Sequence, residues 1–178
     1  MKTYLITIIL LFATISTCYG QMGFMLSSGN FSQSAMGDND INYNFTWDRV
    51  GLFNHYNLNK NWTADWENKF GFMKWWSQEG HHNVNTNSFT SDIAVYRHVY
   101  KKIYLGGSAG FSTIFDPNGL PNLGNSGLYG TFSGRIKYQA TKDFGVVLSL
   151  DHISDAFQDA EDGDGGKNVI SISFCFML

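Results

Sequence analysis

Eight segments of the chain alternate apolar and polar side chains with a period of two. In one of them Trp62, Trp66 and Phe70 alternate with Asp65 and Glu67. Successive side chains of a strand point to opposite faces, so this period predicts strands and is not produced by amphipathic helices. The segments are 22–29, 41–56, 62–76, 88–100, 103–115, 128–138, 144–154 and 168–178. We therefore expect an all-β fold.

The connections between these segments alternate in length. The short ones are 57–61, 101–102 and 139–143, and the long ones are 30–40, 78–87, 116–127 and 155–167. Short turns at one end and long loops at the other are typical of bacterial outer-membrane barrels, and strands of about 9–11 residues cross a bilayer when tilted. The sequence predicts an eight-stranded antiparallel transmembrane β-barrel over residues 21–178, with short periplasmic turns and longer external loops.

The two faces of the expected strands differ in chemistry. A soluble β-sandwich or a lipocalin-like barrel is the alternative, but the aromatic load favours interfacial girdles in a membrane. The tryptophans assigned to those girdles are Trp47, Trp62, Trp66, Trp75 and Trp76, and Phe45 and Phe53 share the face of Trp47. The charged residues assigned to the lumen are Asp48, Asp65, Glu67, Lys69, Arg135 and Lys137, while Arg49, Lys74 and Arg97 occupy positions of apolar parity.

Residues 1–20 have the pattern of an export signal. Lys2 precedes the apolar run YLITIILLFATI, and STCYG ends in small residues suited to cleavage after Gly20. Cys175 is then the only cysteine left, so no internal disulfide is expected. The net charge of −3 and the absence of a basic stripe argue against nucleic acid as a partner. The expected location is the bacterial outer membrane.

His152 and Ser154 continue the even-numbered parity of the apolar Leu148 and Leu150, and Asn168 begins the same parity in the next segment. These three polar side chains should therefore face the lipid on neighbouring strands. From Phe144 to His152 the strand rises roughly 26 Å, or roughly 20 Å along the membrane normal, against an apolar band of about 25 Å. The residues should lie near the outer edge of the hydrocarbon, either as rim polarity or as a site.

The motif HISDA (152–156), a Gly/Asp-rich loop and a final alternating strand resemble the lipid A 3-O-deacylase family and the related acyloxyacyl-hydrolase-like barrels. The likeness is clear over roughly residues 100–178. It implies an enzyme that hydrolyses an ester-linked acyl chain of lipid A in the outer leaflet, with Ser154 as nucleophile and His152 as general base. It implies no metal or organic cofactor.

The family pattern also implies supporting residues. Asp155 stands where the family has Asn, and Asp155 and Ala156 are the implied oxyanion support, through a backbone N–H. No carboxylate stands at the expected third position. By parity Asn168 is the better candidate to orient the histidine, with Glu161 or Asp164 as alternatives if the loop folds back.

Other functions remain open. The chain could be a non-enzymatic small barrel with a structural or adhesive role, or a soluble exported β-domain. A homodimer is also open. His81 and His82 are expected in an external loop, and His55 and His98 are expected to be structural residues near the periplasmic rim.

Overall fold

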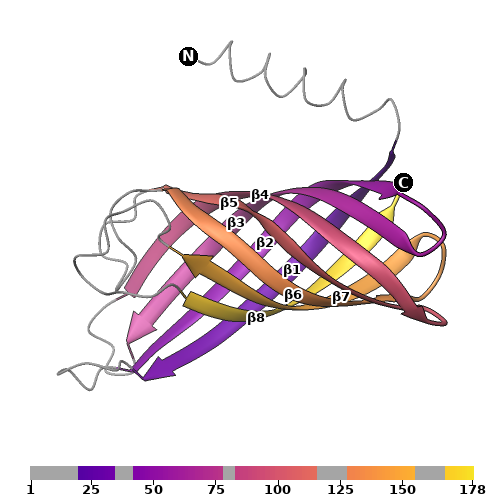
Figure 1. The fold of residues 1–178 in the computed structure, drawn as a ribbon. Coiled ribbons are helices and arrows are strands. Elements are labelled where there is room, and N and C mark those ends of the chain that lie inside the picture. The colour runs from indigo at the N-terminus through magenta and orange to yellow at the C-terminus, as the bar shows by residue number, and fades with distance from the viewer. Residues whose placement is uncertain (1–19, 35–41, 78–82, 116–127, 155–166) are drawn as a thin grey trace, which may run out of the picture.

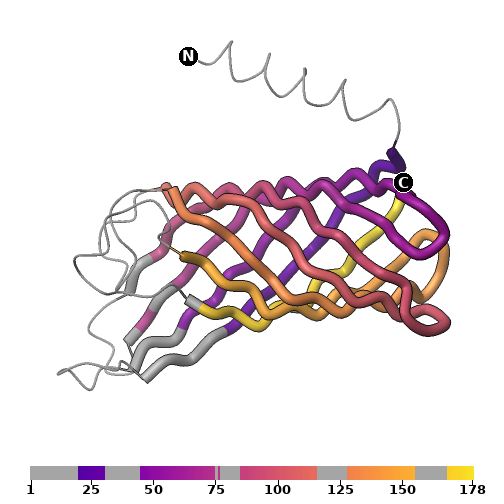
Figure 2. The backbone as a smooth tube through the Cα atoms, in the orientation of Figure 1, coloured from indigo at the N-terminus to yellow at the C-terminus, as the bar shows by residue number. Residues whose placement is uncertain are grey.

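The structure, a computed structural model, describes residues 20–34, 42–77, 83–115, 128–154 and 167–178. Figures 1 and 2 show a set of tilted strands that wrap into one barrel. The strands are β1 (Gln21–Ser34), β2 (Asn42–Asn57), β3 (Trp62–Ser77), β4 (Asn83–Tyr100), β5 (Ile103–Phe115), β6 (Leu128–Gln139), β7 (Phe144–Ser154) and β8 (Lys167–Met177). The expected signal segment lies outside the described residues except for Gly20.

The barrel is closed by hydrogen bonding between its first and last strands. Each strand pairs antiparallel with the next, and β1 pairs with β8 from Gly23 opposite Met177 to Asn30 opposite Ile170. The three short turns lie at the same end of the barrel as the C-terminus (Figure 1). Closure leaves no free edge in the described sheet, as a bilayer requires of strands that cross it.

The strand ranges agree with the expected ones within about two residues, except at β1 and β4. β1 extends to Ser34 and β4 begins at Asn83. These extensions are rich in Asn, Ser and Thr, so their sequence resembles a loop. They are nevertheless paired, for example Gln33 with Tyr43, because backbone pairing can continue beyond the apolar band. No helix in the described part of the chain is long and apolar enough to cross a membrane.

The outward face of the barrel is apolar over most of its height. Large hydrophobic side chains are exposed on all eight strands, where a bilayer would cover them. They include Leu26, Val50, Leu52, Phe70, Phe72, Ile93, Val95, Leu105, Phe111, Phe132, Ile136, Leu148, Leu150, Ile170, Ile172 and Phe174. The predicted fold class is confirmed: the chain is an eight-stranded antiparallel transmembrane β-barrel.

The lumen is filled by side chains that neutralise one another. Among the described buried residues, four carboxylates accompany four basic side chains: Asp65, Glu67, Asp92 and Asp151 with Arg49, Lys69, Arg135 and Lys137. Glu67 forms salt bridges with Lys69 at 2.8 Å and with Arg135 at 2.6 Å. Lys137 lies 2.9 Å from Asp65. The predicted inward position is therefore confirmed for five of the six charged residues, all except Asp48.

β2 departs from the expected arrangement of faces. Asp48 was predicted to face the lumen, but it is exposed on the outer wall and accepts a hydrogen bond of 2.6 Å from the Ser28 hydroxyl. Trp47, predicted in a girdle, is 1% exposed inside the barrel, and Phe45 and Phe53 are buried with it. The reason is that a narrow barrel must fill its lumen, and large aromatic side chains do this as well as ion pairs.

Other tryptophans lie on the outer face as expected. Trp62 is exposed, with the Arg97 guanidinium 5.9 Å from its ring centroid, and Lys74 lies 5.6 Å from the ring of Trp76. The side chain of Trp75 is outside the described part.

At the turn end, His55 bonds Asp65 at 2.6 Å and His98 bonds the Lys101 carbonyl at 2.7 Å. Both histidines thus have structural partners.

Candidate active site

His152 and Ser154 lie on the outward face of β7, as the alternation predicts. Along this strand, buried residues such as Val147 and Asp151 alternate with more exposed ones such as Leu150. His152 and Ser154 are half-buried and belong to the more exposed set. They occupy the end of β7 farthest from the short turns.

Asn168 lies beside His152 on the neighbouring strand. The two residues are directly opposite in the β7–β8 ladder, and Nδ1 of His152 is 2.9 Å from Oδ1 of Asn168. An amide oxygen can only accept, so this hydrogen bond holds the proton on Nδ1. In this tautomer of the neutral ring Nε2 carries the lone pair, which a general base requires.

Ser154 stands two residues beyond His152 on the same face, roughly 6.6 Å away along the strand. No hydrogen bond joins these two side chains in the described part of the structure, so contact requires rotation of the hydroxyl and the imidazole. Across the β6–β7 ladder Ser154 faces Gly130. Glycine has no side chain, so Gly130 places no side chain against the hydroxyl.

Apolar side chains border this polar group. Phe132 lies opposite His152 on β6 and is 53% exposed. Leu150 and Ile170 precede and follow the polar residues on β7 and β8, and they are 54% and 61% exposed. The outer wall therefore passes from the polar Ser154, His152 and Asn168 to exposed apolar side chains on the same three strands.

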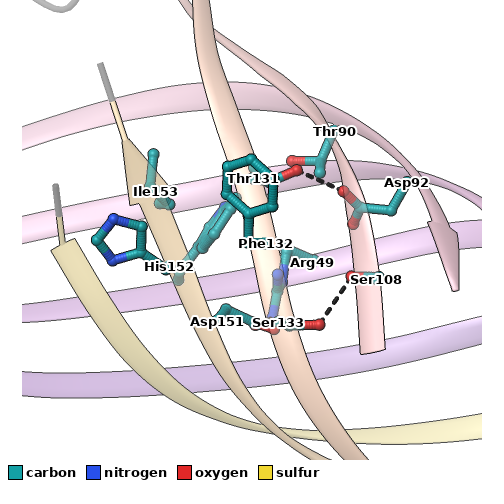
Figure 3. A pocket seen from close by; sticks show the side chains of 11 residues that line it. Arg49, Thr90, Asp92, Ser108, Thr131, Phe132, Ser133, Asp151, His152 and Ile153 are labelled. Carbon is teal, nitrogen blue, oxygen red and sulfur yellow. Dashed lines mark hydrogen bonds and ion pairs between the residues drawn. The ribbon is translucent and has the colours of Figure 1, made fainter. Parts of the chain in front are cut away.

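On the lumenal side of the same strands lies a buried cluster. Figure 3 shows His152 and Asp151 leaving β7 on opposite sides, with Asp151 directed toward Arg49. Oδ2 of Asp151 accepts hydrogen bonds from Nη2 of Arg49 at 2.7 Å and from the Ser171 hydroxyl at 2.8 Å. A small pocket reaches from this cluster to His152 and Phe132.

Some residues of the predicted site cannot be placed. Asp155, Ala156, Glu161 and Asp164 lie outside the described residues, as do His81 and His82. Their predicted roles stay predictions. Of the predicted third members, the described structure brings Asn168 to His152.

Phe132 and Gly130 are neighbours of the site that the sequence pattern alone does not indicate. Alternation in 128–138 does put both on the outward face, but their positions opposite His152 and Ser154 depend on the strand register. The register of this pair follows from the short turn 140–143, which could have been used to find them.

Comparisons with known proteins support the fold. No protein-family model matches the sequence, and no curated protein matches it. Among solved structures, the N-terminal β-barrel domain of Pseudomonas aeruginosa OprF is 14% identical, with a TM-score of 0.50, covering 89% of this chain and 99% of that domain. The Yersinia pestis outer-membrane protein Ail in a phospholipid nanodisc is 10% identical, with a TM-score of 0.46, covering 88% of this chain and 99% of that one.

A de novo designed transmembrane β-barrel is also similar, at 10% identity and a TM-score of 0.49, covering 90% of this chain and 97% of the design. The likeness to the OprF barrel domain, at 14% identity, concerns the fold alone.

Proposed function

We propose that this barrel is an outer-membrane esterase that hydrolyses an ester-linked acyl chain of lipid A. The observation that carries the proposal is the 2.9 Å contact between Nδ1 of His152 and Oδ1 of Asn168, on a lipid-facing surface that also presents Ser154. The resemblance of the HISDA motif to the lipid A 3-O-deacylase family supports the same chemistry.

The proposed reaction proceeds through an acyl-enzyme. Ser154 Oγ attacks the ester carbonyl carbon while Nε2 of His152 takes its proton, and Asn168 holds the imidazole in the required tautomer. The tetrahedral intermediate collapses, and the sugar alcohol leaves with the proton from Nε2. Water, deprotonated by the same nitrogen, then cleaves the acyl-serine ester and releases the fatty acid.

The surroundings fit a substrate that remains in the membrane. Acyl chains would lie along the wall against Phe132, Leu150 and Ile170, which are each more than half exposed. The ester would then stand at the height of Ser154, where hydrocarbon gives way to head groups. Lateral approach from the outer leaflet needs no pocket in the lumen, which is filled by ion pairs.

Mass spectrometry of lipid A from expressing cells tests the proposal. The wild type should lower the lipid A mass by one acyl chain, and Ser154→Ala should abolish this change, a loss of roughly a thousandfold or more in rate. Ser28→Ala is the matched control, because Ser28 is an outward-facing serine on β1 that bonds Asp48. It should remain active.

Heat-modifiable gel mobility would verify that all three proteins are folded. If the folded wild type leaves lipid A and a mixture of other acyl esters intact, the esterase proposal is wrong and a non-enzymatic barrel is the better description.

A further inference from the structure

We infer that a buried clasp in the lumen, formed by Arg49, Asp151 and Ser171, positions the His152–Asn168 pair on the opposite side of the barrel wall. This inference rests on the proposed function, because it assigns positioning residues to that site. None of the three clasp residues can touch a substrate in the membrane, since all are buried inside the barrel at 1–6% exposure.

The clasp joins the two strands that carry the site. Asp151 on β7 accepts the hydroxyl of Ser171 on β8 at 2.8 Å, and Arg49 on β2 donates to both, at 2.7 Å in each case. Nη2 of Arg49 also lies 3.1 Å from Ser27 Oγ on β1. Four neighbouring strands, β7, β8, β1 and β2, thus meet at one guanidinium nitrogen.

The guanidinium of Arg49 also packs against the ring of Trp47. Its Cζ lies 4.2 Å from the ring centroid of Trp47, and the indole Nε1 of Trp47 donates to Ser88 Oγ at 2.9 Å on β4. The residues that hold the guanidinium, Trp47 and Ser88, are themselves buried.

The clasp can act on the His152–Asn168 pair because both lie near the same end of the β7–β8 ladder. The described β7–β8 ladder ends at Ile153 opposite Lys167, so the His152–Asn168 pair is the last but one. Ends of ladders open most readily, because few backbone hydrogen bonds lie beyond them. Asp151 is adjacent to His152 in the chain, so a bond from Asp151 to β8 restrains the separation of Nδ1 and Oδ1 across the same two strands.

Two measurements on Ser171→Ala test this inference. The first is the kinetics of ester hydrolysis in detergent micelles: kcat should fall about tenfold or more with KM unchanged, because misorientation of a catalytic group by even 1 Å is costly. The second is the exchange rate of the Nδ1 proton of His152 in NMR spectra, assigned by its absence in His152→Gln. This proton should exchange faster once the clasp is weakened.

Ser149→Ala is the matched control. Ser149 is a buried lumenal serine directly opposite Ser171 in the ladder, at 5% exposure. It has no hydrogen bond to the clasp in the described structure, so kcat and the Nδ1 proton should stay as in the wild type.

A second variant keeps the inference testable if Ser171→Ala does not fold. Arg49→Gln combined with Asp151→Asn removes both charges together and leaves no unpaired buried charge. It should show the same loss in kcat and the same faster exchange. If folded Ser171→Ala and the double variant both keep the wild-type kcat and Nδ1 exchange rate, the clasp does not position the site.

The two proposals fail separately. An inactive wild type contradicts the esterase proposal, yet the Nδ1 exchange rates of Ser171→Ala and Ser149→Ala still decide whether the clasp holds His152 to Asn168. An active wild type with an unaffected Ser171→Ala contradicts the clasp alone.

Discussion

Nδ1 of His152 and Oδ1 of Asn168 lie 2.9 Å apart on the lipid-facing side of two adjacent strands. An amide in this position fixes the tautomer of the imidazole without adding a negative charge. In the proposed reaction, Asn168 would orient the base, but it would contribute less than a carboxylate to stabilising the imidazolium formed during attack.

Substitution of Asn168 tests this division of roles. Asn168→Ala should lower kcat roughly 10- to 100-fold because the imidazole loses its orienting partner. Asn168→Asp should equal or exceed the wild type, since a carboxylate accepts the same Nδ1 proton and also stabilises the imidazolium. Steady-state hydrolysis of a lipid ester in micelles measures both. Equal activity of the alanine variant and the wild type would show that the hydrogen bond has no part in the reaction.

The ion pairs in the lumen should contribute to stability. Glu67→Gln removes the carboxylate that receives both Lys69 and Arg135 and leaves buried positive charge with fewer partners. We expect a loss of about 3–5 kcal/mol in the free energy of unfolding. Urea unfolding in lipid vesicles measures it. Lys142→Ala is the control, because Lys142 is exposed and lies 3.9 Å from Asp143, and it should cause no measurable change.

Replacing Asp48 should not lower the free energy of unfolding, whereas replacing a lumenal carboxylate should. It is exposed on the outer wall, where a charged group is poorly solvated by the membrane. Asp48→Val should leave the free energy of unfolding unchanged or raise it by up to about 1 kcal/mol. Asp65→Val, which deprives Lys137 and His55 of their partner, should lower it in the same vesicle assay. Equal destabilisation by the two variants would contradict the outward position of Asp48.

The tryptophans offer an optical test of the two faces. Brominated lipids quench indoles that contact the bilayer, so they should quench Trp62, which is 40% exposed, and leave Trp47, which is 1% exposed. The quenched fraction of the fluorescence should fall in Trp62→Phe and rise in Trp47→Phe. If Trp47→Phe loses the quenched component instead, the assignment of β2 is inverted.

The sequence predicts most of the fold because the period of two and the alternation of loop lengths act within short segments. The outward position of His152, Ser154 and Asn168 follows from parity alone. β2 was misassigned because Phe45, Trp47 and Phe53 share a face with Arg49, and an aromatic face can serve either a girdle or a packed lumen. Only the closed barrel distinguishes these two uses.

The clasp of Arg49, Asp151 and Ser171 could not be predicted from the sequence, because its residues are far apart in the chain. Arg49 and Asp151 are 102 residues apart in the chain, and their contact depends on closure of the barrel and on the register of four strands. No local pattern carries that information. The Asn168 contact was accessible because β7 and β8 are consecutive and parity put the two residues on one face.

The pairing of β8 with β1 has a consequence for biogenesis. β8 is both the strand that completes the ring and the strand that carries Asn168. Until β8 pairs with β7 and β1, Asn168 does not lie opposite His152, and Ser171 does not reach Arg49. If the barrel is the proposed esterase, its activity would therefore depend on completed closure of the barrel, and a chain whose β8 is still unpaired should leave the surrounding lipid intact.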